Sequence, residues 1–521
     1  MPHGDPPHPL GTPDDVNITW EARAPVTDPT LGIDVPPPAG PPGHHRLVTV
    51  GDSLTHGFQS GAVSRTSLSW PALVAKELGW ADFRYPTYEG YGGLPLNIEV
   101  TLRHLEAEFG TLELVESIPA VAWLLHWAHQ VEHWWAVGAD DAWHPPPGRN
   151  HNLGVYSFDV ADSWRRTLAE VERAIVPPSH EWLRLMVPND VDRAARRVLV
   201  DADQDMGTID VAKAHGDDGG IETLVVALGA NNVLDVVIKL DYSWATGEAD
   251  RGKKTVWSPT FFASDWAELV RRIKEIDAQH VILATVPHVT IVPLLSRAGD
   301  RLRSSSRYFA YYTHVWLADR FDRGRDRYLT GDQARAIDSA IDQYNQTIIE
   351  SVRAARQEGR DWYVLEMSGM LDRLAFRRYL TDDAAEAVPT WWKAAGGAYP
   401  LPAALRNLTP PPDSRFFLSG PKGRTQGGLF ALDGVHPTTA GYGLLAQEVI
   451  RIMAKAGVTF YKDDGVTPRT GRVAINFNKL LTQDPLLTDP PKTLASDVKI
   501  IGFINDKVNL LSSLLGRRGL V

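Results

Sequence analysis

Short apolar runs alternate along this chain with longer segments whose apolar residues recur at helical spacing. The short runs have the length and residue types of buried parallel strands, which predicts strands over Arg46–Val50, Asp82–Tyr85, Thr223–Leu228, His280–Thr285 and Trp362–Glu366. The longer segments predict helices over Trp70–Leu78, Ser163–Ile175, Asp265–Ile276 with Ser264 as its cap, and Asp332–Arg356.

This alternation of strands and helices predicts an α/β fold. The expected architecture is a doubly wound, flavodoxin-like parallel sheet of about five strands, with helices on both faces. In such sheets, binding and catalytic residues gather just beyond the carboxyl ends of the strands. The residues that follow each predicted strand are therefore the first candidates for chemistry.

The first predicted strand runs into Gly51-Asp52-Ser53-Leu54. Ser53 thus lies where a buried strand breaks into a glycine-flanked turn, a setting that exposes a serine nucleophile and holds it rigidly. The same pattern also fits an ordinary strand-to-helix turn in which Ser53 is a helix cap. A histidine, a carboxylate and oxyanion donors elsewhere in the chain decide between these interpretations.

A candidate base and its partner occur near the other end of the chain, in Asp433-Gly434-Val435-His436. A serine nucleophile needs a base that takes its proton, and the base needs an acceptor that stabilises the imidazolium. Asp433 and His436 can fill both roles from one loop, which Pro437 and Thr438 place at the start of a helix. Taken alone, this spacing is also typical of capping at a protein surface.

The third motif, Gly229-Ala230-Asn231-Asn232, follows the predicted strand Thr223–Leu228. Asn231 is therefore expected at the carboxyl edge of the sheet. An asparagine amide in that place can donate a hydrogen bond to a developing oxyanion, although asparagine is also common in turns.

These three motifs, in this order, resemble those of the SGNH hydrolases, also called the GDSL esterase and lipase family. The resemblance implies Ser53 as nucleophile, Asp433 and His436 as the other triad members, and Asn231 with the Ser53 backbone N–H as oxyanion-hole donors. It further implies an acyl-enzyme intermediate, a small-molecule or lipid ester as substrate, and no metal or organic cofactor. An acyltransferase or a carbohydrate acetylesterase with the same triad is an alternative, as is a non-catalytic binding module of the same fold.

One motif of the family departs from its usual pattern. The family places a glycine after the second strand, and the backbone N–H of that glycine is a further oxyanion donor. The best-matching run here has Ser157 in its place, and Gly92 and Gly93 are the alternative. Asn232 is a second departure, since an aspartate is usual after the oxyanion asparagine.

Ser53 and His436 are far apart in the sequence. If both belong to one active site, a single catalytic domain must include most of the 521 residues. We therefore predict an extended proline-rich arm over 1–45, a catalytic domain over 46–457, and a C-terminal appendage over 458–521. Large helical insertions are predicted at about 93–150 and 287–331. His288 and His314 in the second insertion lack the Asp-x-x-His setting, so His436 is the predicted base.

The first insertion contains the tryptophan-rich run Trp123–Trp135. We interpret it as an amphipathic cap that forms a wall or lid of the acyl pocket. On a helix, its His126, His129 and His133 share one face, so a zinc site is the alternative interpretation.

The amino-acid composition excludes several classes of binding partner. The net charge of -11 argues against binding to nucleic acid or to an anionic membrane surface, and the absence of cysteine excludes disulfides and thiolate metal sites. No segment has the length of apolar residues that a membrane span needs, so membrane contact is limited to the surface of a lipid substrate. The N-terminus lacks a secretory pattern, which predicts a cytoplasmic protein, or a secreted one whose signal has been removed.

Overall fold

The computed structural model describes residues 6–110, 118–176, 187, 189–303, 306–381, 388–492, 501–502 and 505. Its central sheet has five parallel strands: β1 (Val48–Gly51), β5 (Asn152–Gly154), β6 (Ile221–Ala227), β9 (Ala278–Ala284) and β13 (Trp362–Leu365). Their spatial order, β13-β9-β6-β1-β5, becomes 2-1-3-4-5 when the strands are numbered along the chain, which is the flavodoxin-like order. The predicted α/β class with a five-stranded parallel sheet is confirmed.

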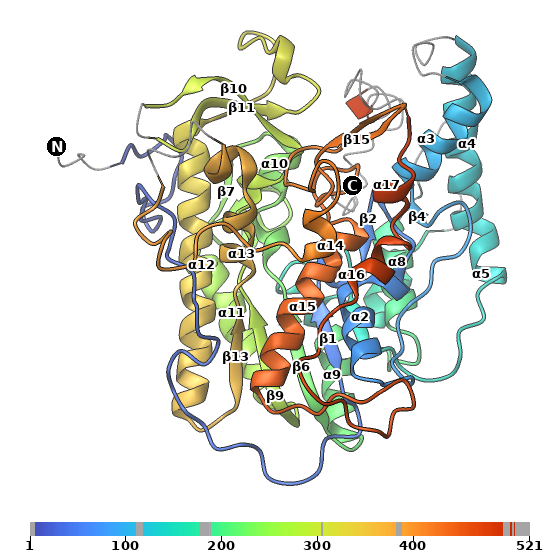
Figure 1. Cartoon of the computed structure of the whole chain (residues 1–521), viewed down its shortest axis with the longest axis vertical. Coiled ribbons are helices and arrows are strands. Elements are labelled where there is room, and N and C mark those ends of the chain that lie inside the picture. The colour runs from blue at the N-terminus through green and yellow to red at the C-terminus, as the bar shows by residue number, and fades with distance from the viewer. Residues whose placement is uncertain are drawn as a thin grey trace.

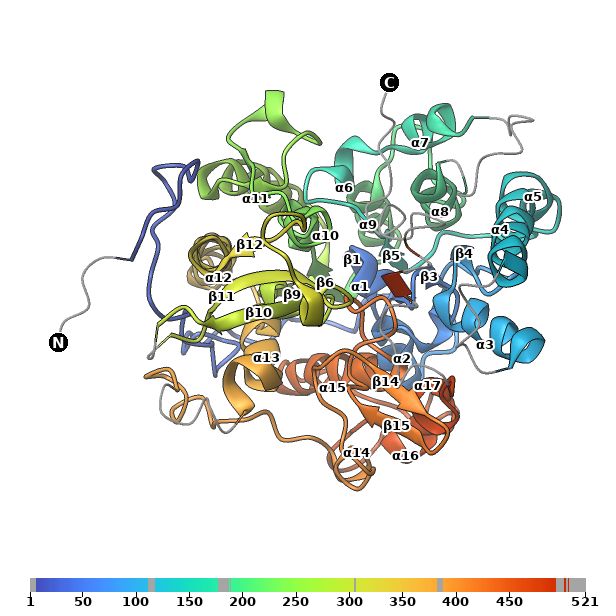
Figure 2. The same ribbon diagram turned by 90° about the horizontal axis from the view of Figure 1, so that it is seen from above.

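Helices cover both faces of this sheet (Figure 1, Figure 2). On one face α2 (Trp70–Glu77) packs against α15 (Thr439–Lys455), and the other face is covered by α9 (Thr208–Asp217), α11 (Pro259–Ile273) and α12 (Gly331–Gln357). From β1 the chain passes to β5 on one side, and the later strands are added on the other side, beginning with β6. The switch point of the sheet, where doubly wound folds bind ligands, therefore lies between β1 and β6.

One predicted strand is wrong. The segment Asp82–Tyr85 begins in a turn and forms no ladder, and its Arg84 carbonyl accepts hydrogen bonds from the N–H groups of His151 and Asn152 at 2.9 and 3.1 Å. The edge strand is instead β5, which the sequence analysis missed. With only three residues, β5 is too short to produce a periodic signal.

Two predicted helices have different ends in the structure. Ser258 rather than Ser264 caps α11, because its hydroxyl accepts a hydrogen bond from the Phe261 N–H at 3.3 Å. The segment Ser163–Ile175 forms two helices, α6 (Asp162–Arg165) and α7 (Leu168–Ala174), since Thr167 starts a new helix by capping it. In both places the helix begins at the residue whose side chain can accept a hydrogen bond from an unpaired N–H group of the first turn, and not where the apolar periodicity begins.

The two insertions differ in structure. The segment at about 93–150 is helical as predicted, with α3 (Ile98–Phe109), α4 (Ile118–His133), the π-helix Trp134–Gly138 and α5 (Ala139–Asp141). The prediction of a helical insertion at 287–331 is wrong. That segment forms an antiparallel sheet of β10 (Leu295–Arg301), β11 (Phe309–His314) and β12 (Leu329–Thr330), as suits the aromatic and β-branched residues of β11.

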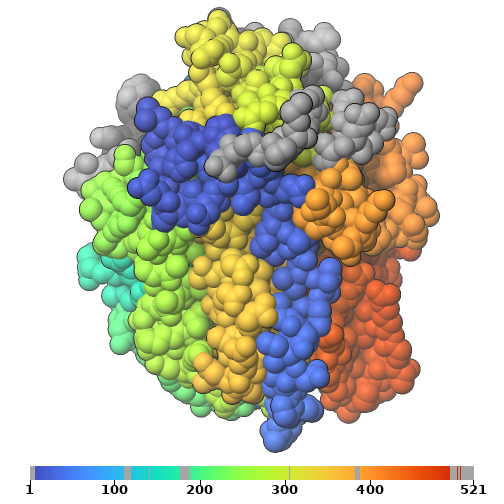
Figure 3. All heavy atoms as spheres, turned by 90° about the vertical axis from the view of Figure 1, so that its left-hand side faces the viewer, coloured from blue at the N-terminus to red at the C-terminus, as the bar shows by residue number. Residues whose placement is uncertain are grey.

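The N-terminal arm lies along the body of the protein and crosses α12 (Figure 3). Backbone carbonyls hold it there: Pro29 accepts from the Val364 N–H at 3.0 Å, and Ile33 accepts from the Arg356 guanidinium at 2.8 Å. Val16 of the arm belongs to the same buried cluster as the sheet residues and Leu486 of the C-terminal segment. One apolar core therefore takes in residues from both terminal segments.

Shorter elements complete the described part of the chain. They are α1 (Ser53–His56), β2 (Phe58–Gln59), β3 (Ala62–Val63), β4 (Leu94–Pro95), α8 (Asp190–Val198), α10 (Asp235–Lys239), β7 (Trp244–Ala245), β8 (Val256–Trp257), α13 (Met367–Leu374), the π-helix Phe376–Leu380, α14 (Ala403–Arg406), β14 (Leu418–Gly420), β15 (Gly423–Gln426), α16 (Phe477–Leu481) and α17 (Pro485–Thr488). No helix in these described ranges is both long and apolar enough to cross a lipid bilayer.

Candidate active site

Ser53 is the first residue of α1, and only Asp52 separates it from the end of β1. In Figure 2, α1 lies near the centre of the view. The backbone of α1 packs directly against the carboxyl ends of β1 and β5. A Cβ on Gly51 would lie 2.1 Å from the Thr55 hydroxyl, and a Cβ on Gly154 would lie 2.5 Å from the His56 nitrogen. Glycine at the ends of β1 and β5 therefore lets α1 hold Ser53 above the carboxyl edge of the sheet.

Asp52 caps α1 and takes no part in the hydrogen bonds of the nucleophile. Its side chain is buried, and its Oδ1 accepts a hydrogen bond from the Leu54 N–H at 3.0 Å. Burial raises the pKa of this carboxyl to about 6, although the Leu54 N–H and the nearby His436 act in the opposite direction.

Ser53, His436 and Asp433 form a continuous chain of hydrogen bonds. His436 Nε2 lies 2.8 Å from Ser53 Oγ, and His436 Nδ1 lies 3.1 Å from Asp433 Oδ2. All three side chains are buried, and Ser53 and His436 are 383 positions apart in the sequence. A proton on Nδ1 that is donated to Asp433 leaves Nε2 free to accept the serine proton, which is the arrangement of a serine nucleophile and its base.

Asp433 is held by further donors. Its Oδ1 accepts from the backbone N–H groups of Val435 and His436, each at 2.8 Å, and its Oδ2 also accepts from the Gly61 N–H at 3.0 Å. Burial alone would raise the pKa of this carboxyl, but the charge of His436 and these hydrogen bonds hold it below its ordinary value. Asp433 thus stays ionised beside the imidazole.

Asn231 lies beyond the carboxyl end of β6, as predicted, and is half-buried. Its amide nitrogen donates one hydrogen bond to the Phe158 carbonyl at 2.9 Å, which leaves the second amide hydrogen for another acceptor. The neighbouring Asn232 is fully buried, and its Oδ1 accepts from the Val160 N–H at 3.2 Å. Both asparagines therefore support the loop that follows β5.

Ser157 lies in that same loop and has a φ of +65°, a left-handed conformation that favours glycine. This backbone explains why a glycine usually occupies the matching position in the resembling family. The alternative residues, Gly92 and Gly93, pack against Val100 and Val63, and they are no more part of the lining of the cavity at Ser53 than Ser157 is. Ser157 stays the predicted backbone donor.

His56, which the sequence analysis did not single out, positions the loop after β5. Its Nδ1 accepts from the Tyr156 N–H at 3.2 Å, and its Nε2 lies 2.7 Å from the Tyr88 hydroxyl, which in turn donates to the Ala194 carbonyl at 3.0 Å. Burial lowers the pKa of His56 to about 3, so this imidazole is neutral at ordinary pH. Its place in the turn motif, three residues after Ser53, is the only sequence signal for this role.

A cavity of about 110 Å³ opens at Ser53 and His436. Its wall is aliphatic, sulfur-containing or aromatic almost throughout, and is built by α13, α15 and the loops after β6 and β9: Leu54, Ala230, Leu234, Pro287, Val289, Val292, Met367, Met370, Leu371, Leu374, Leu429, Phe430, Val435, Pro437, Gly441, Leu444 and Leu445. Such a wall accepts an apolar group and offers no side-chain partners for the hydroxyl groups of a sugar.

The tryptophan-rich insertion does not wall this cavity. No described residue of 93–150 lines it, whereas Pro287, Val289 and Val292 at the start of the second insertion do. The Trp135 indole instead donates to the Gly93 carbonyl at 2.9 Å, and the Arg197 guanidinium of α8 donates to the Ala139 carbonyl at 2.8 Å. The interpretation of this insertion as a wall of the acyl pocket is therefore not supported by the described residues.

The other candidate histidines lie apart from Ser53. His288 is held between Asp372 and Asp342 at 2.9 and 3.0 Å, and His314 Nε2 lies 3.2 Å from the Val237 carbonyl. On α4, the groups of nearby ligand atoms found in the described part of the chain do not include His126, His129 and His133.

Three other buried histidines, His45, His151 and His215, gather at the amino edge of the sheet and offer nitrogen atoms within 4.8 Å of one another. Their hydrogen bonds do not fit a metal site. His151 Nδ1 accepts from the Arg84 N–H at 2.9 Å, so its proton is on Nε2, which lies 3.0 Å from His45 Nδ1. His45 then carries its proton on Nε2, toward Asp218 at 3.4 Å. A metal ligand needs an unprotonated nitrogen whose lone pair is free, and in this chain the unprotonated Nδ1 of His45 and that of His151 each already accept a hydrogen bond.

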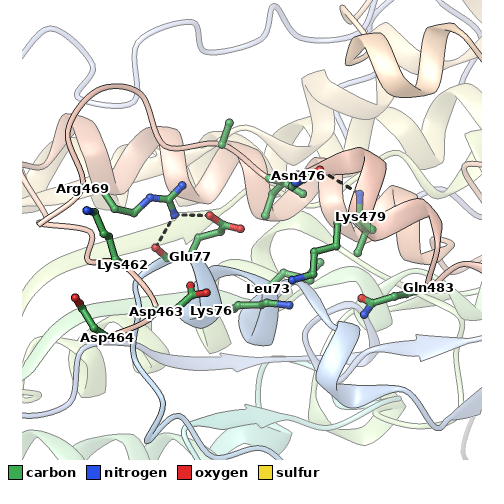
Figure 4. Close-up of a pocket in the computed structure, with 13 residues that line it drawn as sticks. Leu73, Lys76, Glu77, Lys462, Asp463, Asp464, Arg469, Asn476, Lys479 and Gln483 are labelled. Carbon is green, nitrogen blue, oxygen red and sulfur yellow. Dashed lines mark hydrogen bonds and ion pairs between the residues drawn. The ribbon is translucent and has the colours of Figure 1, made fainter. Parts of the chain in front are cut away.

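A larger cavity, of about 530 Å³, lies between α2 and the C-terminal segment (Figure 4). Arg469 and Glu77 form an ion pair at one end, and the side chains of Lys76 and Lys479 extend toward each other at the other end. Among the described residues, its lining contains no serine, threonine, tyrosine or histidine. Ser53 and His436, the candidate nucleophile and base, line the smaller cavity.

Comparison of this chain with protein-family models, with curated proteins and with solved structures finds no match. A functional assignment therefore depends on the geometry at Ser53 and on the three motifs that resemble the SGNH hydrolases.

Proposed function

We propose that this protein is a serine carboxylester hydrolase of the SGNH type. The observation that carries the proposal is the hydrogen-bonded chain from Ser53 Oγ through His436 to Asp433, at the mouth of an apolar cavity. An ordinary helix cap would not need a histidine and a carboxylate from a loop 383 positions away.

The mechanism follows from the positions of these groups. Ser53 Oγ attacks the ester carbonyl carbon while His436 Nε2 takes the serine proton. The Ser53 N–H, the second amide hydrogen of Asn231 and a backbone N–H near Ser157 are the donors for the resulting oxyanion. The alcohol then leaves with the proton from His436, and water, deprotonated by the same imidazole, attacks the acyl-enzyme and releases the carboxylic acid.

The cavity wall supports an apolar acyl group as the part of the substrate that enters. Met367, Met370, Leu371 and Leu374 of α13 supply much of this wall, and a volume of about 110 Å³ favours a short chain. Transfer of the acyl group to an alcohol uses the same triad and differs in whether an alcohol or water reaches the acyl-enzyme.

The test is hydrolysis of p-nitrophenyl esters of rising chain length, with and without an acceptor alcohol. We expect turnover of the short esters, and loss of at least about 10³-fold in kcat in Ser53→Ala with an unchanged circular dichroism spectrum. The matched control is Ser69→Ala, which removes a buried hydroxyl without a hydrogen-bond partner and should keep full activity. Retained hydrolysis in Ser53→Ala, or no turnover of any ester, would contradict the proposal.

A further inference from the structure

A second cavity, of about 30 Å³ and rich in arginine, is adjacent to the wall of the apolar one. Four arginines line it: Arg297 from β10, Arg307, and Arg377 and Arg378 from the π-helix that follows α13. The hydroxyl-bearing residues Thr290, Tyr312 and Ser414 also line it. This concentration of guanidinium groups has no part in the proposed ester hydrolysis.

Two of these arginines lack a carboxylate partner. Arg378 is neutralised by Asp338 at 2.7 Å. By contrast, within the described ranges no ion pair joins a carboxylate to Arg377 or to Arg297. The Arg377 guanidinium donates to the Ser296 hydroxyl at 3.0 Å, and Arg297 lies over the Phe309 ring, 4.6 Å from its centroid.

The positive charges near Arg377 outweigh the negative ones. Burial and the like charges of Arg297 and Arg415 lower the pKa of Arg377 to about 10, against weaker opposing effects of Asp413 and Asp319. Asp413 is itself bound by Arg415 at 2.7 Å. Arg377 is half-buried, and its only side-chain hydrogen bond in the described part of the chain is to the neutral Ser296 hydroxyl. A partly desolvated positive charge without a carboxylate partner is unfavourable, so the addition of an anion to this pocket lowers the free energy of the folded state.

We propose that the arginine pocket, formed by Arg297, Arg307, Arg377 and Arg378, binds a small oxyanion such as a phosphate or carboxylate group. The guanidinium group presents several N–H donors in a planar fork that matches both kinds of oxyanion. The volume of about 30 Å³ admits a group of that size and excludes most of a larger molecule. A larger ligand would therefore place only its anionic head in the pocket.

The arginine pocket shares its walls with the apolar cavity. Leu374 lines the apolar cavity and the adjacent Ala375 lines the arginine pocket, while Val289 and Val292 line the first and Thr290 lines the second. A bound oxyanion would hold the π-helix Phe376–Leu380 against the segment from Thr290 to Arg297. Binding of the anion can be tested without any assumption about the proposed esterase activity.

The experiment measures thermal unfolding and isothermal titration calorimetry with inorganic phosphate, methyl phosphate or acetate, with ionic strength held constant by sodium chloride. For the unaltered protein we expect saturable binding of at least one of them and a rise in Tm of about 2–3 °C when the ligand is at about 100 times its Kd. Binding of inorganic phosphate alone assigns a free ion, equal binding of methyl phosphate assigns a head group, and binding of acetate alone assigns a carboxylate.

Arg377→Gln should abolish both the binding signal and the rise in Tm, and in chloride buffer it should be no less stable than the unaltered protein, because it removes an unpaired charge. The matched control is Arg373→Gln on α13, whose guanidinium donates to the Gly397 carbonyl at 2.7 Å and does not line the pocket. It should keep the response to the anion.

If Arg377→Gln does not fold, Arg297→Gln serves instead, since Arg297 is exposed, and it should weaken binding at least about tenfold. The proposal is wrong if the unaltered protein responds to none of the three oxyanions beyond the effect of chloride. It is also wrong if binding survives substitution of the pocket arginines.

Discussion

Two buried aspartates near Ser53 have opposite electrostatic settings. Asp433 accepts backbone hydrogen bonds on both carboxyl oxygens and faces His436, so its pKa is held below the ordinary value. Asp52 accepts from the Leu54 N–H, and burial raises its pKa to about 6. Asp433 is therefore arranged to stay charged as the partner of the base, while Asp52 bears a charge at pH 7 only at a cost in stability.

Asp433→Asn should lower kcat for ester hydrolysis by about 10⁴-fold, because an amide in this place favours the wrong tautomer of His436. The fold should be kept, since Asn retains an oxygen for the backbone donors of the loop. Steady-state kinetics with a short p-nitrophenyl ester and a circular dichroism spectrum measure the two effects. Activity within tenfold of that of the unaltered protein would show that Asp433 does not orient His436.

Asp52→Asn should stabilise the protein at neutral pH. The raised pKa of Asp52, about 6, means that its favourable protonation is complete below pH 4 and is lost as the pH rises through 6, whereas Asn keeps the Leu54 hydrogen bond at every pH. Relative to the unaltered protein, the variant should gain about 2–3 kcal/mol more at pH 7 than at pH 4. Urea unfolding at both pH values measures this difference, and a difference independent of pH would contradict the role of the carboxyl charge.

At the scale of elements, the site depends on how closely α1 crosses the ends of β1 and β5. Gly51 and Gly154 permit this approach, and Gly434 permits a similar one, because a Cβ there would lie 2.8 Å from the Leu294 nitrogen. Ser53 and the loop of His436 are thus each placed by contacts in which only glycine fits. These close contacts set the position of Ser53 relative to His436.

Gly51→Ala should displace α1, because the added Cβ would meet the Thr55 hydroxyl at 2.1 Å and the Ala227 carbonyl at 2.8 Å. We expect a loss of about 1–3 kcal/mol in the free energy of unfolding, together with a fall in kcat larger than any change in KM. The control is Gly247→Ala, where a Cβ would meet nothing within 4 Å. Equal stability and activity of the two variants would refute the importance of this contact.

At the scale of the whole molecule, the two edges of the sheet have different roles. The carboxyl edge carries Ser53, Asn231 and the apolar cavity, while the amino edge carries the chain of buried histidines. His215 Nε2 donates to the Asn150 carbonyl at 2.9 Å and packs against His45 and His151. The three neutral imidazoles thus connect the segment before β1, the segment before β5 and the helix α9.

His215→Gln should reduce the sensitivity of the protein to acid. Burial lowers the pKa of His215 to about 4, so below pH 6.5 only the unfolded chain takes up this proton, and stability present above pH 6.5 is lost as the pH falls. Gln keeps a donor for the Asn150 carbonyl but does not titrate. Between pH 7 and pH 5 the variant should lose about 1–2 kcal/mol less than the unaltered protein in urea unfolding.

The control is His8→Gln, which replaces an exposed histidine that lies outside the buried histidine cluster. A decline between pH 7 and pH 5 that is equally steep in His215→Gln and in the unaltered protein would contradict the role of His215.

The elements that could be predicted were those with a strong local signal. The strands β6 and β9 have seven residues each with a continuous apolar stretch, β13 is apolar or aromatic throughout, and α12 has apolar residues at helical spacing over its whole length, so the α/β class was predictable. The strand β5 was missed because its three residues pair only through the ladder with β1. The small sheet of β10, β11 and β12 was predicted as helical, because only β11 has the aromatic and β-branched residues of a strand, whereas β10 is a largely polar run that contains glycine and two arginines.

The sequence by itself determined which groups are available for chemistry, because a strand end with Gly-Asp-Ser-Leu and a loop with Asp-x-x-His have local patterns. Only the tertiary structure decided that Ser53 and His436 meet at 2.8 Å, that α13 and the second insertion rather than the tryptophan-rich segment line the cavity, and that His56 supports the loop after β5. The physical reason is that periodicity and turn chemistry act over a few residues. Packing across the sheet joins residues hundreds of positions apart and leaves no mark in any short stretch of sequence.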